Sequence, residues 1–215
     1  MSAALGRPKQ ARSPSGGSEP HAVGSVGAAG TRFTVTDTPL AGLKRIERHP
    51  LGDARGFLSR LFCAEELAAA GWHAPIAQIN HTFTEAQGTV RGLHYQRPPH
   101  AEMKLVSCLR GTVWDVAVDL RAGSPTYLRW HAEILSADNH VALLIPEGFA
   151  HGFQTQTGDV EMLYCHSSFY APASEAGLNP RDPRIGVAWP LPVQGLSPRD
   201  AGHPMIDTAF EGVGL

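Results

Sequence analysis

The sequence predicts an all-β fold, a sandwich or a barrel, from three observations. Short runs rich in β-branched and aromatic residues recur from position 33 to position 190, and Gly, Pro and Asp separate them. The segment 114–120, Trp-Asp-Val-Ala-Val-Asp-Leu, alternates large apolar residues with small or acidic ones, as a strand with one buried face does. Only 64–70 has helical character, and it is short. Many short strands joined by turns are typical of antiparallel sandwiches and barrels.

The predicted strands follow one another with few interruptions. Arg110-Gly111 is expected to form a tight hairpin turn between two of them. The pattern predicts strands at 33–36, 43–48, 56–62, 76–84, 89–96, 103–109, 112–119, 126–135, 141–146, 150–156 and 160–170.

Composition divides the chain into three parts. Residues 1–30 are rich in Ala, Gly, Ser and Pro, so they cannot bury enough apolar surface to offset their ordering entropy, and we expect a flexible tail. Residues 31–192 are expected to form the barrel. Residues 193–215 lose strand character and are expected to pack on the barrel as an arm, with a short helix starting near Ser197.

Charge and cysteine content exclude several classes of protein. The net charge of -2 gives no electrostatic basis for binding nucleic acid or an anionic membrane. No run approaches the roughly 20 apolar residues of a membrane span, and the first residues lack the apolar core of a secretory signal. The three cysteines are far apart, odd in number and without a Cys-x-x-Cys motif, which argues against a disulfide framework. We therefore expect a cytoplasmic protein.

The segment 88–104 carries the most chemical information. It places Arg91, His94, His100 and Lys104 among strand residues, although the chain holds only three lysines against fifteen arginines. A histidine has a pKa near neutrality and can act as a base, and a lysine facing the same pocket can hold a developing enolate oxygen. This pairing is suited to proton abstraction next to a carbonyl group.

Strand parity affects how these residues are placed. Arg91 and His94 have opposite parity, so a regular strand would point them to opposite faces, and a bulge at Gly92 is needed to bring them together. Tyr164 and Tyr170 share one parity, so an unbroken strand would place both on one face.

The residues Pro146-Glu147-Gly148-Phe149-Ala150-His151 have the P-x-G-x-x-H spacing of the second motif of cupins, a class of jelly-roll barrels. Many cupins bind a metal through a first motif with two histidines. Here that segment is His94-Tyr95-Gln96, and a ligand set assembled from His100, Glu102 and His151 would have to span the Pro98-Pro99 turn. We expect no metal and no other cofactor. A metal-dependent cupin enzyme and a non-catalytic sugar-nucleotide binding cupin remain alternatives.

Ordered motifs over about 150 residues resemble the dTDP-4-dehydrorhamnose 3,5-epimerase family, sugar-nucleotide epimerases with a double-stranded β-helix, or cupin jelly-roll barrel, and short peripheral helices. The resemblance implies an enzyme that inverts C3, C5 or both of a dTDP-4-keto-6-deoxyhexose, needs no cofactor and forms a homodimer. The motifs lie at 53–57, 78–80, 90–96, 98–106, 110–121, 123–126, 146–153, 163–164, 169–172 and 196–200.

The resemblance also implies roles for individual residues. His94 matches the catalytic base and Asp200, from the C-terminal arm, the carboxylate paired with it. Lys104 matches the lysine beside the C4 oxygen, and Tyr164 the tyrosine that delivers a proton from the opposite face. The expected substrate contacts are Arg55, Arg60, Gln78, Asn80, Arg91, His151 and Tyr170.

Among these contacts, Arg91 is expected near the diphosphate and Tyr170 against the ligand as a stacking aromatic. Arg55 matches an arginine that reaches the nucleotide site across a dimer interface. Three departures leave the exact sugar and the number of inverted centres open. Arg60 stands where the family often has glutamate, the tryptophan common before Asp182-Pro183 is missing, and the segment 80–91 is one residue longer than in many members.

Overall fold

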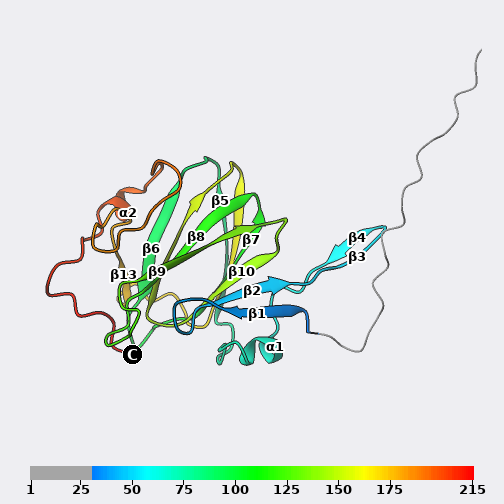
Figure 1. Ribbon diagram of the computed structural model, residues 1–215, viewed down its shortest axis with the longest axis horizontal. Coiled ribbons are helices and arrows are strands. Elements are labelled where there is room, and N and C mark those ends of the chain that lie inside the picture. Colours follow the sequence, from blue (N-terminus) through cyan, green and yellow to red (C-terminus); the bar gives the residue numbers. More distant parts are fainter. Residues whose placement is uncertain (1–30) are drawn as a thin grey trace, which may run out of the picture. The chain divides into compact units, whose positions relative to one another are not determined.

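The structure is a computed structural model that describes residues 31–215; the predicted tail at 1–30 lies outside the described residues. Two antiparallel sheets form the barrel (Figure 1). In order across the first sheet, the strands are β1 (Phe33–Asp37), β2 (Lys44–Arg48), β10 (Val141–Ile145), β7 (Lys104–Arg110), β12 (Val160–His166) and β5 (Gln78–Thr84). The second sheet consists of β13 (Glu175–Gly177), β6 (Val90–Gln96), β11 (Phe149–Thr155), β8 (Thr112–Asp119) and β9 (Trp130–Ser136).

Both faces of the central strands of each sheet are covered, which explains why strands such as β10 and β11 are apolar or buried along their whole length. A central cluster that includes Val106, Phe153 and Met162 fills the space between the sheets. Around helix α1 (Ala64–Ala68), Leu67 and Trp72 cover the outer face of the first sheet. The outer face of the second sheet is covered by apolar residues of the C-terminal segments.

The all-β jelly-roll prediction is confirmed, and so are most of the strands. The turn predicted at Arg110-Gly111 is present, with a φ of +74° at Gly111, but the predicted hairpin was wrong: β7 and β8 belong to different sheets, so the turn is a corner between the two sheets. The predicted strand 126–135 begins only at Trp130. Residues before it form a turn because the Asp119 carboxylate accepts hydrogen bonds from the Arg121, Ser124 and Thr126 side chains.

Two other strand predictions were wrong in their limits. The strand predicted at 56–62 is only β4 (Gly56–Leu58), which forms a hairpin with the unpredicted β3 (Leu51–Asp53). Phe62 instead packs edge-on against Trp72, beside α1. The strand predicted at 160–170 ends at His166, so the parity argument that placed Tyr164 and Tyr170 on one face does not hold. The short β13 was also missed.

The C-terminal segment returns to the barrel. Helix α2 (Pro198–Ala201) starts where the sequence predicted, with the Ser197 hydroxyl accepting the Asp200 N–H at 3.0 Å as an N-cap. Isolated bridges pair Gln194 with Thr89 and Val213 with Arg121. No helix in the part of the chain that the structure describes is long and apolar enough to cross a membrane.

Candidate active site

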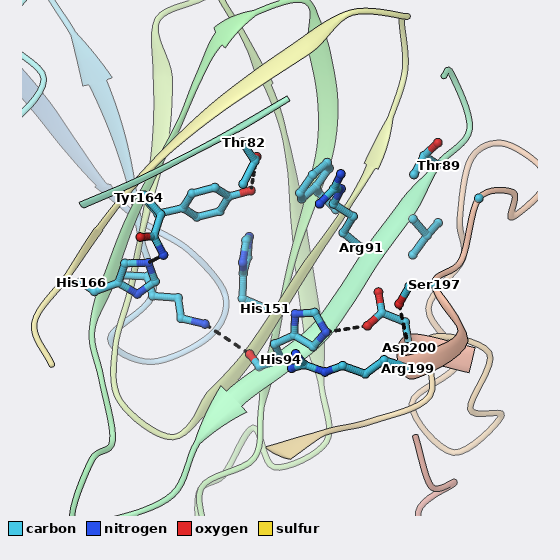
Figure 2. Close-up of a pocket in the computed structure, with 15 residues that line it drawn as sticks. Thr82, Thr89, Arg91, His94, His151, Tyr164, His166, Ser197, Arg199 and Asp200 are labelled. Atoms are coloured by element: carbon cyan, nitrogen blue, oxygen red, sulfur yellow. Dashed lines mark hydrogen bonds and ion pairs between the residues drawn. The ribbon is translucent and has the colours of Figure 1, made fainter. Parts of the chain in front are cut away.

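The end of the barrel that the apolar core leaves open holds a cavity of about 440 Å³. Residues of the same parity as the core residues continue along the strands toward it, so the strands that bury Val106 and Met162 also direct Lys104 and Tyr164 inward. The described residues around this cavity are Asn80, Thr82, Thr89, Val90, Arg91, His94, Lys104, His151, Phe153, Tyr164, His166, Gly195, Ser197, Arg199 and Asp200 (Figure 2).

His94 and Asp200 form the first histidine–carboxylate pair of the cavity. His94 Nε2 lies 2.7 Å from Asp200 Oδ1, and the Gly92 N–H donates to Oδ2 at 3.3 Å. Burial acts to raise the pKa of the Asp200 carboxyl, but the hydrogen bonds and charge of His94 and the Gly92 N–H outweigh burial and lower this pKa. The ionised carboxylate can only accept, so Nε2 carries the proton of neutral His94 and Nδ1 keeps a free lone pair.

A bulge in β6 brings Arg91 and His94 to the same cavity. In the pairing of β6 with β11, His94 lies opposite His151 and Arg91 opposite Phe153, so three steps on β6 match two on β11. Gly92 has a φ of +122°, and a Cβ there would lie 2.6 Å from the Gly152 Cα. The predicted bulge is confirmed, and only glycine fits at its centre.

His151 and Asp115 form a second pair, deeper in the barrel. His151 Nε2 lies 2.9 Å from Asp115 Oδ1, the Asp115 side chain is fully buried, and its Oδ2 has no hydrogen-bond partner. Burial raises the pKa of the Asp115 carboxyl more than the nearby His151 and Lys104 lower it. An acidic residue inside the apolar run of β8 was the sequence signal for Asp115, and the sequence analysis did not use it.

Tyr164 enters the cavity from β12, with the His151 ring between it and His94 (Figure 2). Its hydroxyl lies 3.4 Å from the Thr82 hydroxyl. Burial strongly raises the pKa of Tyr164, so this phenol keeps its proton at neutral pH and can donate it.

Lys104 completes the group on β7. Its Nζ donates to the His94 carbonyl oxygen at 3.4 Å and lies 3.2 Å from Glu102 Oε1. Glu102 Oε2 in turn lies 2.9 Å from His166 Nδ1. The sequence analysis assigned no role in this site to Glu102 or His166, although Glu102 stands two positions before the lysine and His166 shares the parity of Tyr164.

A neighbouring cavity of about 220 Å³ shares Asn80, His94, Lys104 and His166 with the first. It also brings in the predicted contacts Gln78 and Tyr170. The Tyr170 N–H donates to Gln78 Oε1 at 3.1 Å, and its hydroxyl donates to Glu175 Oε2 at 2.8 Å. The Tyr170 ring is half exposed, which leaves a face free for stacking.

The predicted arginines fall into two groups. Arg91 lines the main cavity, together with Arg199, which the sequence analysis did not single out. Arg55 lies on the β3–β4 hairpin, which projects from the barrel in Figure 1, and pairs with Asp53; its side chain is 90% exposed. Arg60 pairs with Glu66. Neither Arg55 nor Arg60 lines a cavity with His94.

One group of described residues has the spacing of metal ligands. His94, Asp200 and His203 place one ligand atom each within 4.8 Å of one another. His203 Nε2 is buried without a hydrogen-bond partner and lies 3.9 Å from Asp200 Oδ1. The hypothetical set of His100, Glu102 and His151 is not among the groups that the described residues form.

A jelly-roll barrel with an oriented imidazole, a buried ammonium and a protonated phenol around one cavity defines a class of protein: a cupin built for acid–base chemistry. The comparisons with known proteins make the class specific. The chain belongs to the dTDP-4-dehydrorhamnose 3,5-epimerase family, whose model matches residues 37–208.

Three relatives illustrate the similarity. The dTDP-4-dehydrorhamnose 3,5-epimerase of Salmonella typhimurium is 40% identical over 180 residues, 82% of this chain and 97% of that protein. A dTDP-6-deoxy-D-glucose-3,5-epimerase from Legionella pneumophila, solved with dTDP-4-keto-L-rhamnose, is 38% identical with a TM-score of 0.78 over 84% of this chain and 98% of that one. A 3'-monoepimerase from Streptomyces bikiniensis, solved with dTDP-quinovose, is 36% identical with a TM-score of 0.73 over 78% and 85% of the two chains.

Proposed function

We propose that this protein is an epimerase that inverts C3, C5 or both of a dTDP-linked 4-keto-6-deoxyhexose, as in the formation of dTDP-L-rhamnose-type sugars. The observation that carries the proposal is the His94–Asp200 contact of 2.7 Å at a cavity that Lys104 and Tyr164 also line. These groups supply a base, an oxyanion partner and an acid, which are the three functions that inversion next to a ketone requires.

The reaction starts at a carbon next to the C4 ketone, which acidifies its hydrogen. His94 removes that proton through Nδ1, and Asp200 stabilises the imidazolium that forms. Lys104 stabilises the enolate oxygen. Loss of such a donor raises the activation barrier by on the order of 3 kcal/mol. Tyr164 then gives its proton to the opposite face of the carbon. Hydrogen moves only as a proton, so the reaction needs no redox cofactor.

The nucleotide part of the substrate needs cations and an aromatic surface. Arg91 and Arg199 at the main cavity suit the diphosphate, because guanidinium groups bind such oxygens in bidentate fashion. Gln78, Asn80 and Tyr170 border the neighbouring cavity, which suits the nucleoside, and His151 contributes its imidazole between the two reacting groups.

A homodimer would supply the two missing arginines. The outward side chains of β5, an edge strand, include Ile79 and Phe83, which are at least half exposed, and Phe57 and Leu58 of the projecting hairpin are about two-thirds exposed. A second copy that covered these two exposed apolar regions would bury them and bring Arg55 and Arg60 toward the partner's nucleotide. We propose a cytoplasmic location, where nucleotide sugars are made.

Proton NMR in heavy water with dTDP-4-keto-6-deoxyglucose tests the function directly, because it reports each carbon separately. We expect deuterium to enter at C3, at C5 or at both, and a new sugar configuration at the same carbons. Binding of the substrate without any deuterium exchange would contradict the proposal and favour a non-catalytic sugar-nucleotide binding protein.

A further inference from the structure

A carboxylate buried behind Lys104 has no role in the reaction described above. Glu102 lies in the loop that joins β6 to β7, and its side chain is only 9% exposed. Its two oxygens hold different partners, Oε1 at 3.2 Å from Lys104 Nζ and Oε2 at 2.9 Å from His166 Nδ1. Burial acts to raise the pKa of Glu102, but the His166 hydrogen bond and the Lys104 charge outweigh it and lower the pKa, so Glu102 is an anion at neutral pH.

We propose that Glu102 and His166 are positioning residues for Lys104: His166 orients the Glu102 carboxylate, and the carboxylate fixes the ammonium at the cavity and keeps it charged. What the ammonium then does to a substrate rests on the proposed function; where Lys104 lies and whether it is charged do not.

The first step of the argument concerns the lysine itself. The Lys104 side chain is 9% exposed, and its other hydrogen bond, to the His94 carbonyl oxygen, is long at 3.4 Å. Burial without a counter-ion favours the neutral amine, which stabilises an enolate oxygen far less than an ammonium does. Among the described residues, Glu102 is the one carboxylate within ion-pair distance of Lys104.

The second step concerns His166. It lies directly opposite Lys104 where β12 pairs with β7, and its ring stacks on Tyr164 with centroids 6.1 Å apart. An Nδ1–H donor held in this way fixes the plane of the Glu102 carboxylate, and Oε1 is then aimed at the lysine. Here an imidazole orients a carboxylate, whereas in the His94–Asp200 pair a carboxylate orients an imidazole.

The surroundings give the lysine no substitute for Glu102. His94 on β6, Asn80 on β5 and Tyr164 on β12 face the cluster, and none is an anion in the resting site. Asp115 on β8 acts on Lys104 only through space. Beyond β12, the Glu175 carboxylate accepts from the Tyr170 hydroxyl and pairs with Arg199.

The test begins with Glu102→Gln, which keeps the shape, removes the charge and replaces one of the two acceptor oxygens by a donor NH2. We expect kcat for epimerisation to fall about 10- to 100-fold with little change in KM, part of the 10²–10³ that loss of an oxyanion donor costs. The basic limb of the kcat–pH profile should move to lower pH, because the unpaired ammonium gives up its proton more readily.

A matched control lies on β12, the strand that carries His166. Glu161 on β12 lies 3.1 Å from His81 Nε2 and lines neither cavity. Glu161→Gln removes the same charge from a histidine–glutamate pair, so its kcat and pH profile should equal those of the unsubstituted protein. His166→Asn keeps a donor near the Nδ1 position and should retain most activity, whereas His166→Leu should resemble Glu102→Gln.

A readout that needs no turnover separates this inference from the proposed function. The chain has only three lysines, so 13C-labelled lysine gives few NMR signals, and Lys104→Met assigns the buried one. The Lys104 signal should titrate at lower pH in Glu102→Gln than in the unsubstituted protein or in Glu161→Gln. An unchanged titration, or an unchanged kcat in Glu102→Gln, would overturn the positioning role. If the titration moves but the unsubstituted protein exchanges no deuterium, the inference stands and the proposed function falls.

Discussion

Two histidines of the cavity, His94 and His151, each pair with an aspartate at almost the same distance but in opposite surroundings. His94–Asp200 measures 2.7 Å and its imidazole is 33% exposed, whereas His151–Asp115 measures 2.9 Å with both side chains nearly inaccessible. The first carboxyl has its pKa lowered by hydrogen bonds, and the second has its pKa raised by burial. A short contact between the same two groups therefore does not by itself define a general base. We propose His94 for that role because its imidazole can reach a substrate and its partner carboxyl has a lowered pKa.

The largest effect expected from this difference is on proton abstraction. His94→Asn should lower solvent-deuterium exchange at C3 and C5 by about 10⁴-fold, at the upper end of what general-base catalysis contributes. His151→Asn should lower exchange by about 10- to 100-fold and raise KM, because His151 lies beside the reacting groups but does not remove the proton. Rates are measured by proton NMR in heavy water. Equal losses in the two variants would remove the distinction between the pairs.

The next effect concerns the phenol beyond the second pair. Tyr164→Phe should slow inversion about 10²-fold, because the acid that protonates the far face is gone, while deuterium washout from the substrate falls much less. Mass spectrometry of washout and NMR of product configuration, taken from the same samples, give the two rates. A parallel fall in both would argue against Tyr164 as the proton donor.

A smaller effect should appear in stability against pH, with opposite signs for the two carboxyls. Asp200 has a lowered pKa, so its contribution to the free energy of unfolding is present above the unfolded value near 3.9 and is lost as pH falls through the folded value. The gap between the unsubstituted protein and Asp200→Asn should therefore shrink as pH falls from 5 to 3.

Asp115 has a raised pKa, so its ionisation opposes folding once pH rises above the unfolded value. The gap between the unsubstituted protein and Asp115→Asn should therefore shrink as pH rises from 4 to 7, opposite to the trend for Asp200→Asn. Urea unfolding at each pH measures both gaps. The same trend in the two variants would show that the two carboxyls are not separated by their surroundings.

The smallest effect is expected at His203, which together with His94 and Asp200 forms the group with the spacing of metal ligands. If the pair works as a proton carrier, His203→Ala should change kcat less than about threefold, and EDTA should leave the activity intact. Metal analysis of the purified protein is the direct check. Stoichiometric iron, zinc or manganese, together with inactivation by EDTA, would instead favour a metal-dependent cupin.

Local signals in the sequence were sufficient for much of this molecule. Period-two alternation located β8, and parity correctly required a bulge between Arg91 and His94. The Arg110-Gly111 pair located a turn but not the change of sheet that occurs there. Neither signal exists for β13, whose three residues have no pattern and become a strand only through pairing with β6, about 80 residues earlier. The family resemblance, rather than any local pattern, linked Asp200 to His94.

Two residues of the site were missed in the sequence for a related reason. Glu102 and His166 are ordinary polar residues in sequence, 64 positions apart, and their contact depends on the register of β12 against β7. Strand register follows from the packing of the whole barrel, so a single sequence gives no direct signal for it. Arg55 and Arg60 are the opposite case: they were predicted from the family resemblance, but their predicted role depends on a second chain.

The bulge in β6 has a consequence for how the site can change over evolutionary time. Gly92 and Gly152 cross so closely that a side chain on either would meet the other strand's backbone, below 3 Å in each case. A side chain at one position cannot be compensated by a later change at the other, because the contact requires that neither residue has a side chain. The aim of the imidazole is thus controlled by two residues with no functional groups at all, and an alanine scan confined to polar side chains would pass over them.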